Sequence, residues 1–185
     1  MRRLACVAAA LAVMALAAPA RAQSILPFAA EGRVGLAFPT GDFGEGLGLG
    51  YGLGANATFN LLPLIGVYGG YSYTSFDLDT DVRGDEDAYN LQGFDAGLRV
   101  AVPTPGIALS PYLRGGVVWY KGELSGGGAE TDRNLGFQLG AGLDYSLGVL
   151  MSLTPEVSYV RLPAGDGGGP DANFFRADFG LRLRL

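Results

Sequence analysis

Apolar and polar residues alternate with a period of two along much of this chain, most regularly at its C-terminus. In residues 175–185 the odd positions hold Phe, Ala, Phe, Leu, Leu and Leu, and the even positions hold Arg, Asp, Gly, Arg and Arg. Such alternation is typical of a β-strand with one apolar and one polar face. The length of about 11 residues suits a tilted strand that crosses a bilayer.

The same alternation recurs upstream and predicts an all-β chain of eight antiparallel strands. It is clearest in residues 47–61 and 134–147, where leucine and aromatic residues alternate with glycine and polar residues. The predicted strands are Glu31–Pro39, Leu47–Leu61, Gly66–Phe76, Asn90–Val102, Pro111–Lys121, Asn134–Leu147, Leu150–Arg161 and Phe174–Leu185.

The links between these strands alternate in length. Those after the second, fourth and sixth strands are short, whereas most of the others are longer and rich in glycine and aspartate. Short periplasmic turns and longer external loops are typical of up-and-down transmembrane barrels with an even number of strands. We therefore expect an outer-membrane β-barrel with both termini in the periplasm.

The N-terminus has the features of a secretory signal peptide over residues 1–22. Arg2 and Arg3 precede an apolar run at 4–18, and Ala20-Arg21-Ala22 is a small-x-small cleavage site. The barrel domain would then comprise residues 23–185. Removing three of the 13 basic residues leaves 10 against 18 acidic residues, a net charge of −8, which argues against a nucleic-acid partner.

The charged residues within the predicted strands all lie on the polar face, apart from two cations at strand ends. If that face points inward, the lumen encloses five acids and six arginines: Glu31, Arg33, Asp95, Arg99, Arg114, Asp144, Glu156, Arg176, Asp178, Arg182 and Arg184. The interior of an eight-stranded barrel is just wide enough for side chains. We predict a polar core of paired charges that plugs the lumen, and a narrow or gated path for protons or solutes is the alternative.

The remaining 13 acids fall in the four predicted outer loops, and aromatic residues mark the strand ends beside those loops. Seven strands have one aromatic residue on the apolar face near the outer end: Phe38, Tyr51, Tyr73, Trp119, Phe137, Tyr159 and Phe175. The remaining strand has Phe94 on the same face, further from its outer end. This arrangement predicts a girdle at the membrane interface.

In these features the chain resembles the small OmpA/OmpX-type outer-membrane β-barrels, including the opacity-protein-like barrels. The resemblance covers nearly all of residues 29–185 and rests on the alternating strands, not on a catalytic motif. The resemblance implies that the protein lies among the outer-membrane lipids of a Gram-negative-type cell. It also implies that the barrel-assembly machinery recognises the last strand and inserts the chain. That family usually ends in an aromatic residue, whereas this chain ends in Leu185.

Catalysis finds little support in the composition. Those small outer-membrane barrels that are enzymes use a histidine as general acid or base, and this chain has none. Its single cysteine, Cys6, lies in the predicted signal peptide. We expect no enzyme activity, no cofactor and no resident metal.

Two other groups of residues are candidate binding sites. The second outer loop could bind divalent cations weakly, through the six acids Asp77, Asp79, Asp81, Asp85, Glu86 and Asp87. Lys121 and Arg161 are the two strand-end cations of apolar-face parity, and they could contact lipid phosphates or simply extend toward water.

These observations lead to one principal hypothesis and two alternatives. The principal hypothesis is a monomeric outer-membrane protein with a plugged lumen and a structural or surface-interaction role. A small-solute channel of the OmpW-like kind is the first alternative. A soluble lipocalin-like carrier, with its apolar face turned inward, is the second.

Overall fold

The computed structural model describes residues 27–78, 88–102, 104, 108–125, 133–164 and 171–185. The predicted signal peptide and five of the six acids of the predicted cation loop lie outside these residues. Among the described residues, no helix has the length and apolarity needed to cross a membrane.

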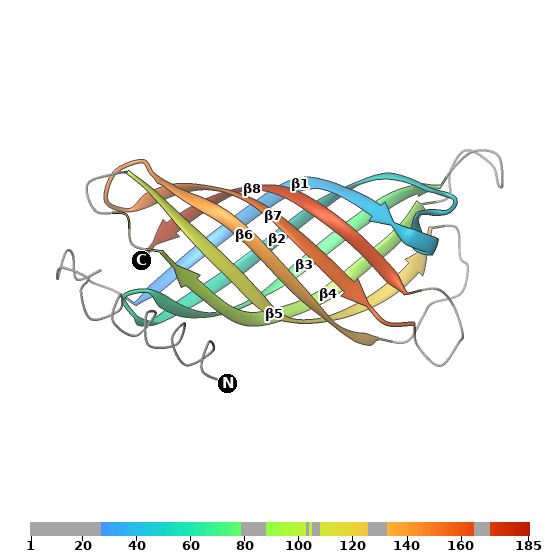
Figure 1. Ribbon diagram of the computed structural model, residues 1–185, viewed down its shortest axis with the longest axis horizontal. Helices are drawn as coiled ribbons and strands as arrows, with labels where there is room; N and C mark the ends of the chain where they lie inside the picture. The colour runs from blue at the N-terminus through green and yellow to red at the C-terminus, as the bar shows by residue number, and fades with distance from the viewer. Residues whose placement is uncertain (1–26, 79–87, 103, 105–107, 126–132, 165–170) are drawn as a thin grey trace, which may run out of the picture.

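Eight antiparallel strands close into one barrel in which every strand pairs with its neighbours in sequence and the last pairs with the first (Figure 1). This confirms the predicted all-β, up-and-down architecture. The strands are β1 (Phe28–Thr40), β2 (Leu47–Leu62), β3 (Ile65–Leu78), β4 (Ala88–Ala101), β5 (Leu109–Leu124), β6 (Asn134–Ser146), β7 (Met151–Leu162) and β8 (Ala172–Arg184).

Closure runs along the full length of the first and last strands, from the Ala29–Arg184 pair to the Thr40–Asn173 pair. The ladder between β6 and β7 is interrupted between the Gly142–Glu156 and Tyr145–Leu153 pairs. Pro155 lies in that interval and has no N–H to donate, so the gap has a direct cause in the sequence. Pro155 nevertheless pairs with Phe179 on its other side, which keeps β7 in the wall.

The two ends of the barrel differ in their connections. We call one the terminal end, because β1 begins and β8 ends there, and the other the loop end (Figure 1). Residues 63–64, 102–108 and 147–150 link strands at the terminal end, and residues 41–46, 79–87, 125–133 and 163–171 link them at the loop end. Three of the loop-end links are longer than every terminal-end link, as predicted, whereas the first, residues 41–46, is one residue shorter than the link at 102–108.

The alternation sets the two faces of the wall. Outward side chains such as Val34, Leu53 and Leu113 are 51–60% exposed, whereas most charged strand residues point inward and are buried. The soluble carrier hypothesis required the opposite orientation and is wrong. The outward surface is instead an apolar belt, which is what a hydrocarbon environment selects.

Several strands extend further at the loop end than the sequence pattern predicted. Asp77 and Glu123, which we predicted to lie in loops, are paired near the loop-end termini of β3 and β5. The reason is that backbone pairing continues beyond the apolar belt, where outward positions become polar. Hydrophobic alternation marks the part of the strand that faces lipid and underestimates the hydrogen-bonded strand.

Leu139 tests the assignment of faces, because its side chain is 59% exposed in the middle of the outward face of β6. Leu139→Arg should destabilise the barrel in bilayers by about 2–4 kcal/mol, since a charge there faces hydrocarbon near the midplane. Leu135→Arg is the matched control on the same strand and face, one residue from the loop-end terminus of β6. Its cost should be about 0–1 kcal/mol.

The measurement is urea unfolding in phospholipid vesicles, with heat-modifiable gel mobility as the assay for folding. Equal stabilities of the two variants would contradict the assignment.

Candidate functional site

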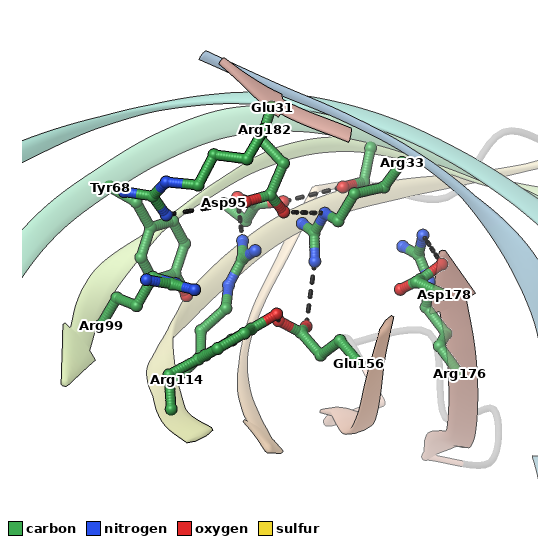
Figure 2. Close-up of polar contacts among 12 residues, drawn as sticks. Glu31, Arg33, Tyr68, Asp95, Arg99, Arg114, Glu156, Arg176, Asp178 and Arg182 are labelled. Carbon is green, nitrogen blue, oxygen red and sulfur yellow. Dashed lines mark hydrogen bonds and ion pairs between the residues drawn. The ribbon is translucent and has the colours of Figure 1, made fainter. Parts of the chain in front are cut away.

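Ten charged side chains are packed inside the barrel, five acidic and five basic. All are at most 8% exposed: Glu31, Arg33, Asp95, Arg99, Arg114, Asp144, Glu156, Arg176, Asp178 and Arg182. They come from β1, β4, β5, β6, β7 and β8, and their formal charges cancel (Figure 2). The structure thus brings together ten of the eleven residues that the sequence placed in the lumen.

Arg184, the eleventh, lies at the terminal-end rim and is only partly buried. Its guanidinium group donates hydrogen bonds to the Val149 carbonyl oxygen at 3.4 Å and the Ser152 hydroxyl at 3.1 Å. Parity assigned it to the polar face correctly, but its place in the last pair of the β8 ladder leaves it at the opening.

Each buried carboxylate lies within ion-pair distance of an arginine. The shortest N–O distances are 2.7 Å for Arg99–Asp144, 2.9 Å for Arg33–Glu156 and Arg176–Asp178, 3.1 Å for Arg114–Asp95, and 3.5 Å for Arg33–Glu31. Arg182 is the most loosely held, at 3.7 Å from Glu31. Except for Arg176–Asp178 on β8 and Arg33–Glu31 on β1, the pairs join different strands, so register and barrel closure decide them.

Two tyrosines extend this network across the lumen. The guanidinium carbon of Arg99 lies 3.6 Å from the Tyr112 ring centroid, and that of Arg114 lies 3.7 Å from the Tyr68 ring centroid. The Tyr112 hydroxyl donates to Glu156 at 2.9 Å, and the Tyr68 hydroxyl accepts from the Gln138 amide at 2.7 Å. Cation–π contacts of this kind are stronger when desolvated, as they are here.

Glycines in the wall make room for these large side chains. A Cβ atom built on Gly142 would lie 2.5 Å from the Tyr112 ring, and one built on Gly116 would lie 2.6 Å from the Tyr68 hydroxyl oxygen. A Cβ on Gly52 would meet the Arg176 guanidinium at 3.0 Å. Glycine at these inward positions therefore compensates for the volume of the arginines and tyrosines.

Toward the loop end the lumen changes from charged to apolar. There the inward positions form a cluster at most 7% exposed: Ala37, Phe43, Phe76, Leu91, Val118, Tyr120, Val160, Leu162, Ala172 and Phe174. The prediction of a lumen that is polar throughout is wrong for this segment. The sequence does indicate this change, because all of these residues except Phe43 occupy inward positions near strand ends.

Phe43 completes the apolar cluster from the link between β1 and β2. It lies on a short 3-10 helix, η1 (Gly41–Gly44), and its ring centroid is 5.5 Å from that of Phe76 and 5.8 Å from that of Tyr89. Gly41 and Gly46 flank the segment with φ of +62° and +86°, where a side chain would be strained. These two glycines turn the link back over the barrel mouth.

Outside the barrel, the predicted aromatic residues face outward near the loop end. Phe38, Tyr51, Trp119, Phe137 and Phe175 are 41–51% exposed, and Tyr73 and Tyr159 are partly exposed. Phe94 is 51% exposed on the same surface. Their positions agree with an interfacial girdle.

The two strand-end cations both lie beside an acid. Lys121 pairs with Glu123, and the Arg161 guanidinium lies 2.9 Å from Asp171. Asp171 also accepts a hydrogen bond from the Ala164 amide, and this bond together with Arg161 lowers the pKa of the Asp171 carboxyl. Of the predicted cation loop only Asp77 is described, at the exposed end of β3, and the described residues contain no cluster of metal-binding side chains.

Solved structures with the same fold are small outer-membrane barrels. Neisserial surface protein A aligns with a TM-score of 0.67 at 14% identity, over 86% of this chain and 97% of that one. Ail, the attachment invasion locus protein of Yersinia pestis, has a TM-score of 0.54 at 18% identity, over 86% and 100%. OprG of Pseudomonas aeruginosa has a TM-score of 0.54 at 16% identity, over 86% and 98%.

At these identities the likeness concerns the fold alone. A comparison with curated protein sequences found no match. The family model described as the outer membrane protein beta-barrel domain matches residues 8–182, nearly the whole chain. With the closed eight-stranded wall and its apolar exterior, this match shows that the chain belongs to the outer-membrane β-barrel family.

Proposed function

We propose that this protein is a non-enzymatic integral outer-membrane barrel with a closed lumen, and that it acts structurally or through its exposed surface. The observation that carries this proposal is the burial of the inward side chains in both parts of the lumen. Paired charges occupy it from the terminal end through its middle, and the apolar cluster around Phe43 and Phe174 occupies the loop end.

The charged layer argues against an open path for ions. Inside a protein an unpaired charge is costly, so moving Arg33 away from Glu156 or Arg114 away from Asp95 would leave both partners uncompensated. The Tyr68 ring restricts the Arg114 guanidinium further, and the Tyr112 ring restricts that of Arg99. An ion would have to displace several such contacts in sequence.

The apolar layer is a second, independent barrier. Phe43, Phe76 and Phe174 form mutual ring contacts with centroid separations of 5.3–6.4 Å. A dry apolar constriction opposes the passage of hydrated solutes, because hydrated ions and polar molecules would lose water contacts there. The two layers exclude different kinds of solute.

We infer that the loop end faces the cell exterior and that both termini are periplasmic. The short links at the terminal end and the longer ones at the loop end support this orientation. Asp42, Glu45 and Asp77 are exposed at the loop end, so the outer surface would attract cationic partners or divalent ions. We also propose that the barrel-assembly machinery inserts the chain and that the folded protein is a monomer.

A small-solute channel is the second candidate, and one observation favours it. Several buried polar atoms in the lumen lack a hydrogen-bond partner, among them the Thr154 hydroxyl and one carboxylate oxygen each of Asp144 and Asp178. Buried polar groups usually find a partner in protein or water. Ordered water at these atoms would be the starting point of a conducting path.

Conductance in planar bilayers separates the two candidates. We expect the purified protein to show no steady channels at the level of porins, under conditions in which a known porin conducts. Phe43→Ala should also remain closed, because the charged layer below it is unchanged. Steady, voltage-independent porin-level conductance of the wild type would contradict the closed-lumen proposal.

Removing one side of a buried pair should destabilise the barrel. Arg114→Ala leaves Asp95 without its ion-pair partner at 3.1 Å and exposes the Tyr68 ring, so we expect a loss of about 3–5 kcal/mol in the free energy of unfolding. Arg184→Ala, at the rim, should cost much less. Urea unfolding in vesicles measures both.

The double variant Asp95→Asn/Arg114→Met extends this test. It should recover part of the loss, since no uncompensated charge remains. A loss equal to the sum of the losses in Asp95→Asn alone and Arg114→Met alone would show that the two side chains are not coupled.

Phe43→Ala should also lower stability, by about 3 kcal/mol, because a ring that is 7% exposed leaves a gap among apolar side chains. Phe175→Ala removes a ring that faces outward and is 46% exposed, so it is the control and should cost less. The same unfolding assay applies. Equal losses would mean that Phe43 does not pack into the barrel mouth.

A further inference from the structure

One flank of the barrel at the loop end combines cationic, aromatic and hydrogen-bonding side chains on its outward face. We call it the β4–β6 flank and define it by Gln92, Phe94, Trp119, Lys121, Glu123 and Arg133. The Arg133 guanidinium carbon lies 5.1 Å from the Trp119 ring centroid and 6.0 Å from the Phe94 ring centroid. Arg133 is exposed and directly precedes β6, just outside the alternating pattern that begins at Asn134.

Hydrogen bonds hold the polar part of this flank in place. The Gln92 amide donates to Glu123 at 3.1 Å and accepts from the Tyr71 hydroxyl at 2.9 Å. Glu123 also pairs with Lys121, whose side chain is 26% exposed. Glu123 therefore offsets the charge of Lys121, and the guanidinium of Arg133 is the more exposed cation above the rings.

The flank lies where the apolar belt ends. Phe94 and Trp119 are 51% and 48% exposed, and the next outward residue of β5 toward the terminal end, Val117, is 51% exposed. A molecule seated here would meet polar and cationic groups at one end and an apolar wall at the other. Membrane lipids have that distribution, whereas a soluble glycan or peptide would gain nothing from the wall.

We propose that the β4–β6 flank binds the anionic phosphate headgroup of a membrane lipid, with an acyl chain against Val117 and neighbouring belt residues. Arg133 would bind the phosphate through its planar fork of donors, while the Trp119 and Phe94 rings hold the guanidinium at headgroup level. Lys121 lies on the same flank with its charge offset by Glu123, so the flank has one net positive charge. The site rests on the membrane location of the barrel and is independent of whether the lumen conducts.

The structure favours this flank over Arg161 on the adjacent strand β7, where it pairs with Phe137 of β6. Arg161 is engaged by Asp171, which the Ala164 amide fixes at 2.9 Å. No aromatic contact of the Arg161 guanidinium accompanies this pair in the described residues. Of the two cations predicted to contact lipid phosphates, Lys121 is retained, and Arg133 replaces Arg161.

Trp119 is the only tryptophan of the chain, so its fluorescence reports directly on this site. The full barrel is reconstituted into phosphatidylcholine vesicles containing a small, equal mole fraction of brominated lipid, either phosphatidylcholine or phosphatidylglycerol. Brominated chains quench a nearby indole. Because the lipids occupy both leaflets, the result does not depend on the orientation of the protein.

We expect brominated phosphatidylglycerol to quench Trp119 more strongly, corresponding to about a fivefold local enrichment for one effective cation. Arg133→Gln should remove most of the excess quenching, Lys121→Gln a smaller part, and Arg161→Gln none. Heat-modifiable mobility verifies folding of each variant. Raising the salt concentration should reduce the excess with the wild-type protein alone, which provides a test that needs no variant.

Three results would overturn the proposal. They are equal quenching by the two brominated lipids, an excess that persists in folded Arg133→Gln, and an excess that salt does not change. Inorganic phosphate, added at constant ionic strength, distinguishes a lipid from a free anion. If it abolishes the excess at concentrations comparable to the lipid, the site binds free phosphate and the lipid proposal is wrong.

Discussion

A closed barrel of eight strands leaves an interior only as wide as its own side chains, and the rest of this structure depends on that constraint. A bilayer requires every backbone group of the wall to be paired, so the sheet must close. Once it closes, whatever points inward is enclosed. Polar residues placed there to keep the exterior apolar must then satisfy one another, as Arg33 and Glu156 do at 2.9 Å.

This constraint explains the balance of charges and the distribution of glycine. Five buried carboxylates face five buried guanidinium groups, so the enclosed layer has no formal net charge. Arginine and tyrosine are too large for all inward positions to carry them, and glycines such as Gly116 and Gly142 provide the space. The enclosed layer thus meets two requirements, neutral charge and limited volume, and Tyr68, Tyr112 and Arg176 each lie over a glycine.

The sequence predicted the architecture well because alternation is a local property. Parity alone turned Arg114 inward and Leu139 outward, and it identified all eight strands. The ion pairs could not be predicted, because Arg99 and Asp144 meet only after the register of two further strand pairs is fixed. Phe43 was missed for a different reason, since it lies in a link with no periodicity and enters the barrel through the two left-handed glycines that flank it.

The polarity of the lumen is inverted relative to that of the surroundings. Beside the apolar belt the interior is charged, whereas beside the girdle of Trp119 and Phe175 the interior is apolar. Charged side chains are thereby kept out of lipid, and aromatic rings such as Phe76 are kept out of water. Arginine occurs in both settings, enclosed and ion-paired at Arg114 and exposed above aromatic rings at Arg133. The first setting stabilises the barrel, and the second leaves donors available to a partner, so the position of an arginine relative to the belt decides whether it serves folding or recognition.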